Sequence, residues 1–98
     1  MINRSYYLSR EEISEFTRNI YFNPNSISKA SSFILENAIN PDRLADIFVG
    51  EMIRTDIHTS KLAILHTMKE LVNLSISTTD AYIKAFGDIL EELIAFIV

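Results

Sequence analysis

Two side chains in the segment SKLAILHTMKELVNLS, residues 60–75, have the types and spacing of a catalytic pair. His66 and Glu70 are four residues apart, so a helix would place them on one face, where a carboxylate can orient an imidazole as a general base. Neither a nucleophile nor an oxyanion hole can be recognised around them. The sequence therefore predicts a protein that is not an enzyme.

A metal site is the second chemistry that this region suggests. His58 and His66 are eight residues apart, with Asp56 and Glu70 nearby, but the sequence contains no His-Glu-x-x-His motif and no cysteine. The two glycines lie inside helical patterns, so no glycine-rich phosphate-binding loop is present. We therefore expect neither a metal nor a cofactor.

A polar strip is the more informative feature of the same segment. At about 100° per residue, its four members fall on one narrow arc of the helix, and apolar residues cover most of the rest. The polar strip consists of His66, Lys69, Glu70 and Asn73, at the spacing i, i+3, i+4 and i+7. One interpretation is the solvated face of a plain helical bundle, and the other is a recognition surface lining a peptide-binding groove. The residue pattern leaves both open.

Helical periodicity runs through the whole chain and predicts five helices and no strand. The first helix should cover residues 10–21, after a capping box formed by Ser9 and Glu12. The sequence NPNS then breaks the chain, and the second helix should begin near Asn25 or Ser26.

The remaining helices also have polar residues at their expected starts. Asn40 should cap the third helix, which continues with a proline in its first turn. Thr59 or Ser60 should cap the fourth helix, and Ser77 and Thr79 supply caps for the fifth.

The predicted fold is a single all-α domain, residues 1–98, in which short loops make successive helices antiparallel neighbours. Gly50 interrupts the apolar pattern of the third helix. Because glycine costs up to about 1 kcal/mol in a helix interior, it predicts close packing by a neighbour or a local bend.

Composition and charge narrow the choice of partners. The chain is 48% hydrophobic and 22% charged, with a net charge of −4. Its nine lysines and arginines are scattered, which argues against a surface for nucleic acid or anionic lipid. Neither a secretory signal nor a membrane-spanning segment can be recognised, so we expect an intracellular protein.

Three segments resemble the CTD-interacting domain (CID) family, whose members bind the heptad-repeat tail of the largest RNA polymerase II subunit in transcription termination or RNA 3′-end processing. The segments are SISKASSFILEN, HTSKLAILHTMKELVNLS and YIKAFGDILEEL. Ile27 and Phe33, the KL-x-x-L pattern that begins at Lys61, and the pair Tyr82 and Phe86 follow the family's order. The VHS and ENTH domains share this architecture, so the resemblance implies a right-handed superhelical array of about five helices.

The resemblance also implies a non-catalytic nuclear protein that binds a peptide through the polar strip. In the family, a tyrosine and acidic or amide side chains of the central helix contact the peptide's turn and its tyrosine. His66 stands at the tyrosine position, Glu70 can replace an aspartate, and Asn73 supplies an amide. Lys69 departs from the pattern, because it is a donor where the family has an acceptor. The tyrosine contact therefore does not transfer directly.

The family's domains continue with further helices, which supply an arginine that reads phosphoserine. No counterpart of that arginine occurs before Val98, so a truncated domain is one expectation. With a net charge of −4, the chain is expected to prefer an unmodified peptide to a heavily phosphorylated one.

The apolar run LIAFIV, residues 93–98, has three open explanations. It can cap the core and leave only Phe96 and Val98 outside, it can continue into further helices, or it can be a self-association surface. In the last case, Phe96 and Val98 would join two copies in a homodimer, and the protein would be a structural or adaptor bundle. A trafficking adaptor of the VHS or ENTH kind is a further alternative.

Overall fold

A computed structural model of the chain describes residues 8–37, 39–87 and 89, and these residues confirm the all-α prediction. The helices are α1 (Arg10–Arg18), α2 (Pro24–Glu36), α3 (Pro41–Arg54) and α4 (His58–Ser75), and a further helical segment covers residues 81–87. The described part of the chain contains no strand. None of its helices is both long and apolar enough to cross a lipid bilayer.

Polar side chains begin several helices as predicted. Ser9 and Glu12 form the capping box, in which Ser9 Oγ accepts from the Glu12 N–H at 3.1 Å and Glu12 Oε1 accepts from the Ser9 N–H at 3.0 Å. Asn40 Oδ1 accepts from the Arg43 N–H at 3.1 Å and caps α3. Thr79 Oγ1 accepts from the first N–H of segment 81–87 at 3.1 Å. Each cap satisfies a backbone donor that the helix itself leaves free.

The predicted start of α4 was wrong. The helix begins at His58, whereas Thr59 or Ser60 was expected to be its cap. Ile57 occupies the N-cap position and makes no side-chain hydrogen bond. A prediction based on the usual capping residues cannot find a helix start of this kind.

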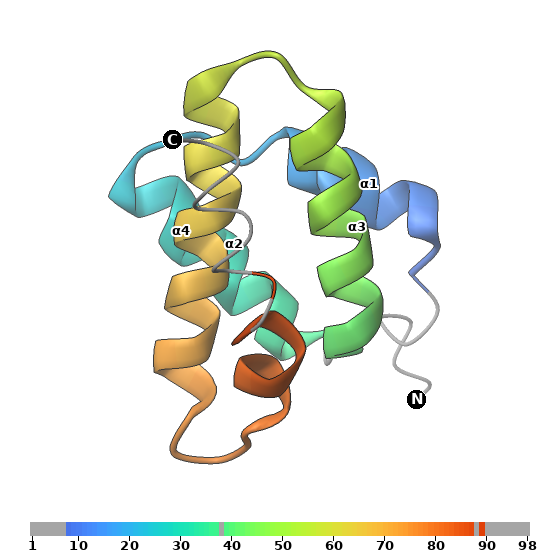
Figure 1. Cartoon of the computed structure of the whole chain (residues 1–98). Helices are drawn as coiled ribbons and strands as arrows, with labels where there is room; N and C mark the ends of the chain where they lie inside the picture. The colour runs from blue at the N-terminus through green and yellow to red at the C-terminus, as the bar shows by residue number, and fades with distance from the viewer. Residues whose placement is uncertain (1–7, 38, 88, 90–98) are drawn as a thin grey trace.

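The helices form two crossed layers, with α3 and α4 antiparallel in front and α1 and α2 behind them (Figure 1). The main contacts join alternate helices, because α1 and α3 lie on one side of the molecule and α2 and α4 on the other. The prediction was that successive helices would pack against each other. Among the described helices, α3 and α4 are the one successive pair with substantial contact.

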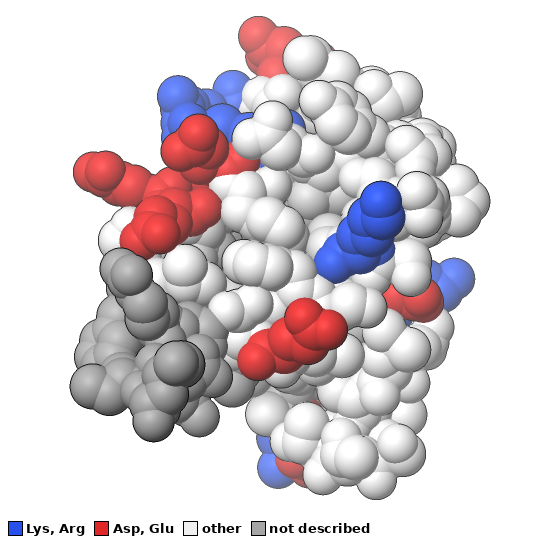
Figure 2. All heavy atoms as spheres, turned by 180° about the vertical axis from the view of Figure 1, so that it is seen from behind, with Lys and Arg blue, Asp and Glu red and all other residues white. Residues whose placement is uncertain are grey.

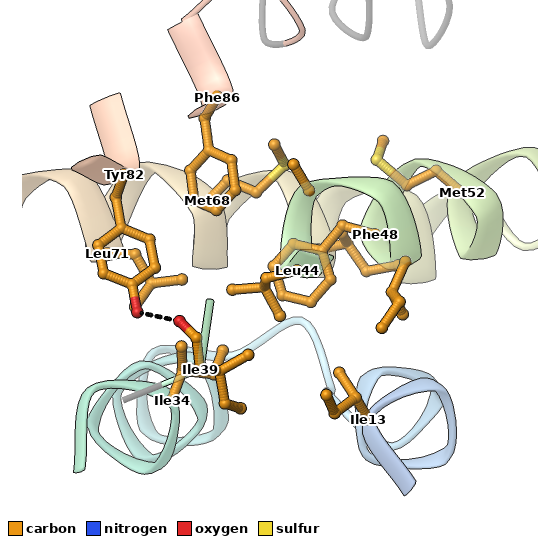
Figure 3. Packing of buried hydrophobic residues seen from close by; sticks show 13 residues of the cluster. Ile13, Ile34, Ile39, Leu44, Phe48, Met52, Met68, Leu71, Tyr82 and Phe86 are labelled. Carbon is orange, nitrogen blue, oxygen red and sulfur yellow. Dashed lines mark hydrogen bonds between the residues drawn. The ribbon is translucent and has the colours of Figure 1, made fainter. Parts of the chain in front are cut away.

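The core fills the space between the layers, and every described helix contributes to it (Figure 3). Its largest fully buried side chains are Phe48, Phe86, Ile34, Leu44, Ile47, Met52, Met68 and Leu71. Four of these side chains belong to the apolar pattern of the third helix, which is therefore confirmed: Leu44, Ile47, Phe48 and Met52. Burial of this apolar surface is the main stabilising contribution to the fold.

Ion pairs join α1 to α3 beside the core. Arg18 Nε donates to Glu51 Oε1 at 2.9 Å, and this hydrogen bond raises the pKa of Arg18. Glu51 is only 8% exposed and also lies 3.6 Å from Arg54. Nearer the start of α1, Arg10 lies 2.6 Å from Asp46. Three arginines on this side of the molecule therefore have carboxylate partners.

Tyr82 joins segment 81–87 to the linker between α2 and α3. Its side chain is 5% exposed, and its hydroxyl donates to the carbonyl of Ile39 at 2.8 Å (Figure 3). Ile39 lies in the linker between α2 and α3, so the bond joins distant parts of the chain. The Tyr82 ring also packs against Phe86, with ring centroids 5.8 Å apart. Burial raises the pKa of the Tyr82 hydroxyl.

The expectation for Gly50 was wrong. Gly50 is exposed within an uninterrupted α3, and a Cβ atom at this position would meet no atom within 4 Å. Neither close packing nor an unusual backbone conformation requires glycine here.

Gly50→Ala should raise the free energy of unfolding by roughly 0.5–1 kcal/mol, because alanine favours the helix and its methyl group meets empty space. Urea unfolding measures the change. Gly50→Pro is the opposing control and should cost about 3 kcal/mol or more, since proline removes a helical N–H. A less stable alanine variant would contradict the open surroundings of Gly50.

Tyr82→Phe should lower the free energy of unfolding by about 1–2 kcal/mol, because the Ile39 carbonyl loses its buried partner. Tyr21→Phe is the matched control: Tyr21 is 66% exposed, so its variant should unfold at the urea midpoint of the wild type. Equal midpoints for all three proteins would show that the Tyr82 hydrogen bond contributes nothing.

The same residue predicts a dependence of stability on pH. The folded state raises the pKa of Tyr82, so the unfolded chain loses this proton at lower pH, near the ordinary tyrosine value of about 10. The stabilisation is complete below that pH and is lost as the pH rises through the folded-state pKa. Urea titrations in alkaline buffers should show a smaller decline for Tyr82→Phe than for the wild type.

Candidate functional site

A hollow of about 600 Å³ lies between α4 and the start of α2, and we call it the α2–α4 groove. One wall is the polar strip, whose predicted residues His66, Lys69, Glu70 and Asn73 all line the hollow. The other wall is formed by Phe22, Asn23, Pro24 and Ile27. Sequence reasoning missed this second wall, because the segment NPNS was interpreted only as a helix break.

The buried face of α4 determines where the polar strip emerges. Ile64, Met68 and Leu71 are at most 3% exposed and belong to the core. The strip occupies another arc of the same helix and comes out where α4 passes the start of α2. From His66 to Asn73 it extends about 10 Å along the helix axis.

Small side chains bring α2 and α4 together. Ala30 and Ala63 belong to one buried cluster, and Ser31 and Thr67 nearby are fully buried. Ser31 donates to the carbonyl of Ile27 at 2.8 Å, and the Thr67 hydroxyl bonds in the same way within α4. Because each hydroxyl is satisfied inside its own helix, both can be buried without a partner across the contact. The two walls of the groove are therefore held at a fixed spacing.

The linker between α1 and α2 covers other residues than predicted. α1 ends at Arg18 rather than at residue 21, and the Asn19 amide donates to the carbonyl of Glu15 at 2.8 Å. α2 begins at Pro24, ahead of the predicted start at residue 25 or 26. The chain between them is therefore available to form a wall of the groove.

Hydrogen bonds hold this linker in place. Asn23 Oδ1 accepts from the Ser26 N–H at 2.8 Å, and Ser26 Oγ accepts from the Tyr21 N–H at 2.9 Å. Phe22 lies between these anchored positions, and its ring centroid is 5.1 Å from that of His66. The aromatic contact thus joins the linker wall to the polar strip at one end of the groove.

The polar strip keeps its hydrogen-bonding capacity free. Within the described residues, none of its four side chains has a hydrogen bond or an ion pair. Glu70 is half-buried, and the other three side chains are exposed. Glu70 can accept hydrogen bonds, Lys69 can donate them, and Asn73 can do both. A ligand that presents donors and acceptors in turn would match this wall.

The structure joins His66 to Phe22 by a ring contact, and among the described residues no hydrogen bond joins His66 to Glu70. No three described His, Asp or Glu side chains come close enough together to hold a metal ion. Phe96 and Val98, the predicted self-association residues, lie outside the described residues, so that interpretation stays a prediction.

Comparisons of the chain with models of known protein families, with curated proteins and with solved structures give no match. The resemblance to CTD-interacting domains therefore stays a prediction.

Proposed function

We propose that this chain is a non-catalytic interaction module that binds an extended peptide in the α2–α4 groove. The observation that carries the proposal is the presence of two unlike walls around one hollow. Phe22, Pro24 and Ile27 make one wall largely apolar, and the polar strip supplies free donors and acceptors on the other. A peptide matches both, because it combines apolar side chains with regularly spaced N–H and C=O groups.

The dimensions of the groove suit a short peptide segment. The polar strip is about 10 Å long, which corresponds to about three residues of an extended chain. A hollow of about 600 Å³ has the volume of typical ligand sites. In such a complex, Glu70 would accept from peptide N–H groups, and Lys69 and Asn73 would donate to peptide carbonyls.

The heptad-repeat tail of RNA polymerase II is the ligand that the resemblance to CTD-interacting domains supports. The family contacts the tyrosine of its peptide from the central helix, and the resemblance makes α4, which carries the polar strip, the corresponding helix. Because Lys69 cannot accept a hydrogen bond, we assign Glu70 as the acceptor for the tyrosine hydroxyl. The protein would then act in the nucleus, in transcription termination or RNA 3′-end processing.

A fluorescent heptad-repeat peptide should bind saturably, and more tightly when it is unphosphorylated, because the net charge of −4 opposes added phosphates. Glu70→Gln should weaken binding about tenfold or more, since hydrogen bonds to charged groups contribute about 1.5–3 kcal/mol. Fluorescence anisotropy measures both affinities.

Glu36→Gln is the matched control, because Glu36 is exposed near the end of α2 and does not line the groove. Its affinity should equal that of the wild type. Absence of saturable binding at hundreds of micromolar of either peptide would rule out the polymerase tail as the ligand. Equal weakening by both substitutions would mean that overall charge, rather than the groove, controls binding.

A further inference from the structure

A second hollow lies beside the α2–α4 groove, on the other side of the α1–α2 linker. It has a volume of about 560 Å³, and we call it the α1–α2 groove. Phe16 and Phe33 form part of its lining, with ring centroids 4.6 Å apart. Asn23 lines both grooves, so the linker is the wall that they share.

Two adjacent aromatic residues stand on this shared wall and face different grooves. Tyr21 lines the α1–α2 groove and Phe22 lines the α2–α4 groove. Their side chains are 66% and 46% exposed, respectively. Exposed aromatic side chains beside hollows are typical anchors of protein interfaces, because they bury a large area at low entropic cost.

The backbone that carries this pair is fixed before any ligand arrives. Besides the two bonds through Ser26, the Asn23 N–H donates to the carbonyl of Tyr21 at 2.9 Å. This part of the linker, residues 21–23, is therefore a preformed ridge between the two grooves. A ligand would not have to order it, which reduces the entropic cost of binding.

Unpaired cations lie on both sides of the ridge. Of the lysines and arginines that the structure describes, those whose side chains have no hydrogen bond or ion pair are Lys29, Arg43 and Lys69. Lys29 lines the α1–α2 groove and Lys69 the α2–α4 groove. Charged side chains gather over α1 and are sparse over α2 (Figure 2). The α1–α2 groove thus holds one free cation, Lys29, and no carboxylate, whereas in the α2–α4 groove Lys69 stands beside the carboxylate of Glu70.

From these observations we infer that both grooves form one binding surface for a weakly acidic, extended peptide with two large apolar side chains. One apolar side chain occupies each groove, against Tyr21 or Phe22, and a carboxylate of the peptide pairs with Lys29, because Glu70 stands beside Lys69 in the other groove. A more highly charged anion fits poorly, because the whole chain carries a net charge of −4. The inference rests on the proposed function and adds the second groove and the class of peptide.

Synthetic peptides test the inference on the whole 98-residue chain. Each peptide carries two phenylalanines at varied spacing with a glutamate between them, and matched peptides replace one phenylalanine by serine or the glutamate by glutamine. We expect the best two-anchor peptide to lose at least about tenfold in affinity when either phenylalanine is removed. Tyr21→Ala and Phe22→Ala should each weaken it to a similar extent, as measured by isothermal titration calorimetry.

Matched controls separate local from general effects. Ile53→Ala removes an apolar side chain of α3 that is 64% exposed but lines neither groove, so it should change the affinity less than twofold. Lys29→Met should weaken binding of the glutamate peptide and should leave the glutamine peptide nearly unaffected. Arg43→Met removes the same charge on α3 and should affect neither peptide.

Two outcomes would overturn the inference. If one-anchor peptides bind as tightly as two-anchor peptides and Tyr21→Ala behaves like Ile53→Ala, only the α2–α4 groove is used, and the proposed function stands alone. If no peptide of the panel binds, the acidic two-anchor class is wrong. The separate titration with the heptad-repeat peptide and Glu70→Gln then decides whether the α2–α4 groove binds any peptide.

Discussion

The close contact between α2 and α4 is the constraint on which the candidate site depends. Ala30 and Ala63 are small enough to be buried where the helices meet, and Ser31 and Thr67 are buried nearby because their hydroxyls bond to carbonyls of their own helices. Larger side chains at this contact would overpack it and move the walls of the α2–α4 groove apart. The polar strip can therefore lie opposite the start of α2 only while this contact is kept.

The two sides of the molecule differ in whether their cationic side chains have carboxylate partners. On the side of α1 and α3, Arg10 and Arg18 are each bonded to a carboxylate, so these charges contribute to holding the helices together. On the side of α2 and α4, small and apolar side chains make the contact, and Lys29 and Lys69 have no partner in the described structure. This division leaves polar groups available for a ligand without weakening the fold, since the exposed lysines remain hydrated.

Features with a local cause could be predicted well. The capping box of Ser9 and the caps at Asn40 and Thr79 depend on residues a few positions apart, and all three were found correctly. The start of α4 at Ile57 and the open surroundings of Gly50 could not be predicted. In the first case no capping side chain marks the start, and in the second only the packing of the other helices decides whether glycine is needed.

The sequence by itself determined that the chain is helical and that four polar residues share one face of α4, because both follow from periodicity along a single helix. Tertiary structure alone decided what this face meets. The pairing of α2 with α4, the position of Phe22 beside His66, and the ridge between two grooves all depend on contacts between residues far apart in the chain. Local patterns carry no information about such distances, since packing between helices is set by the shapes of both partners.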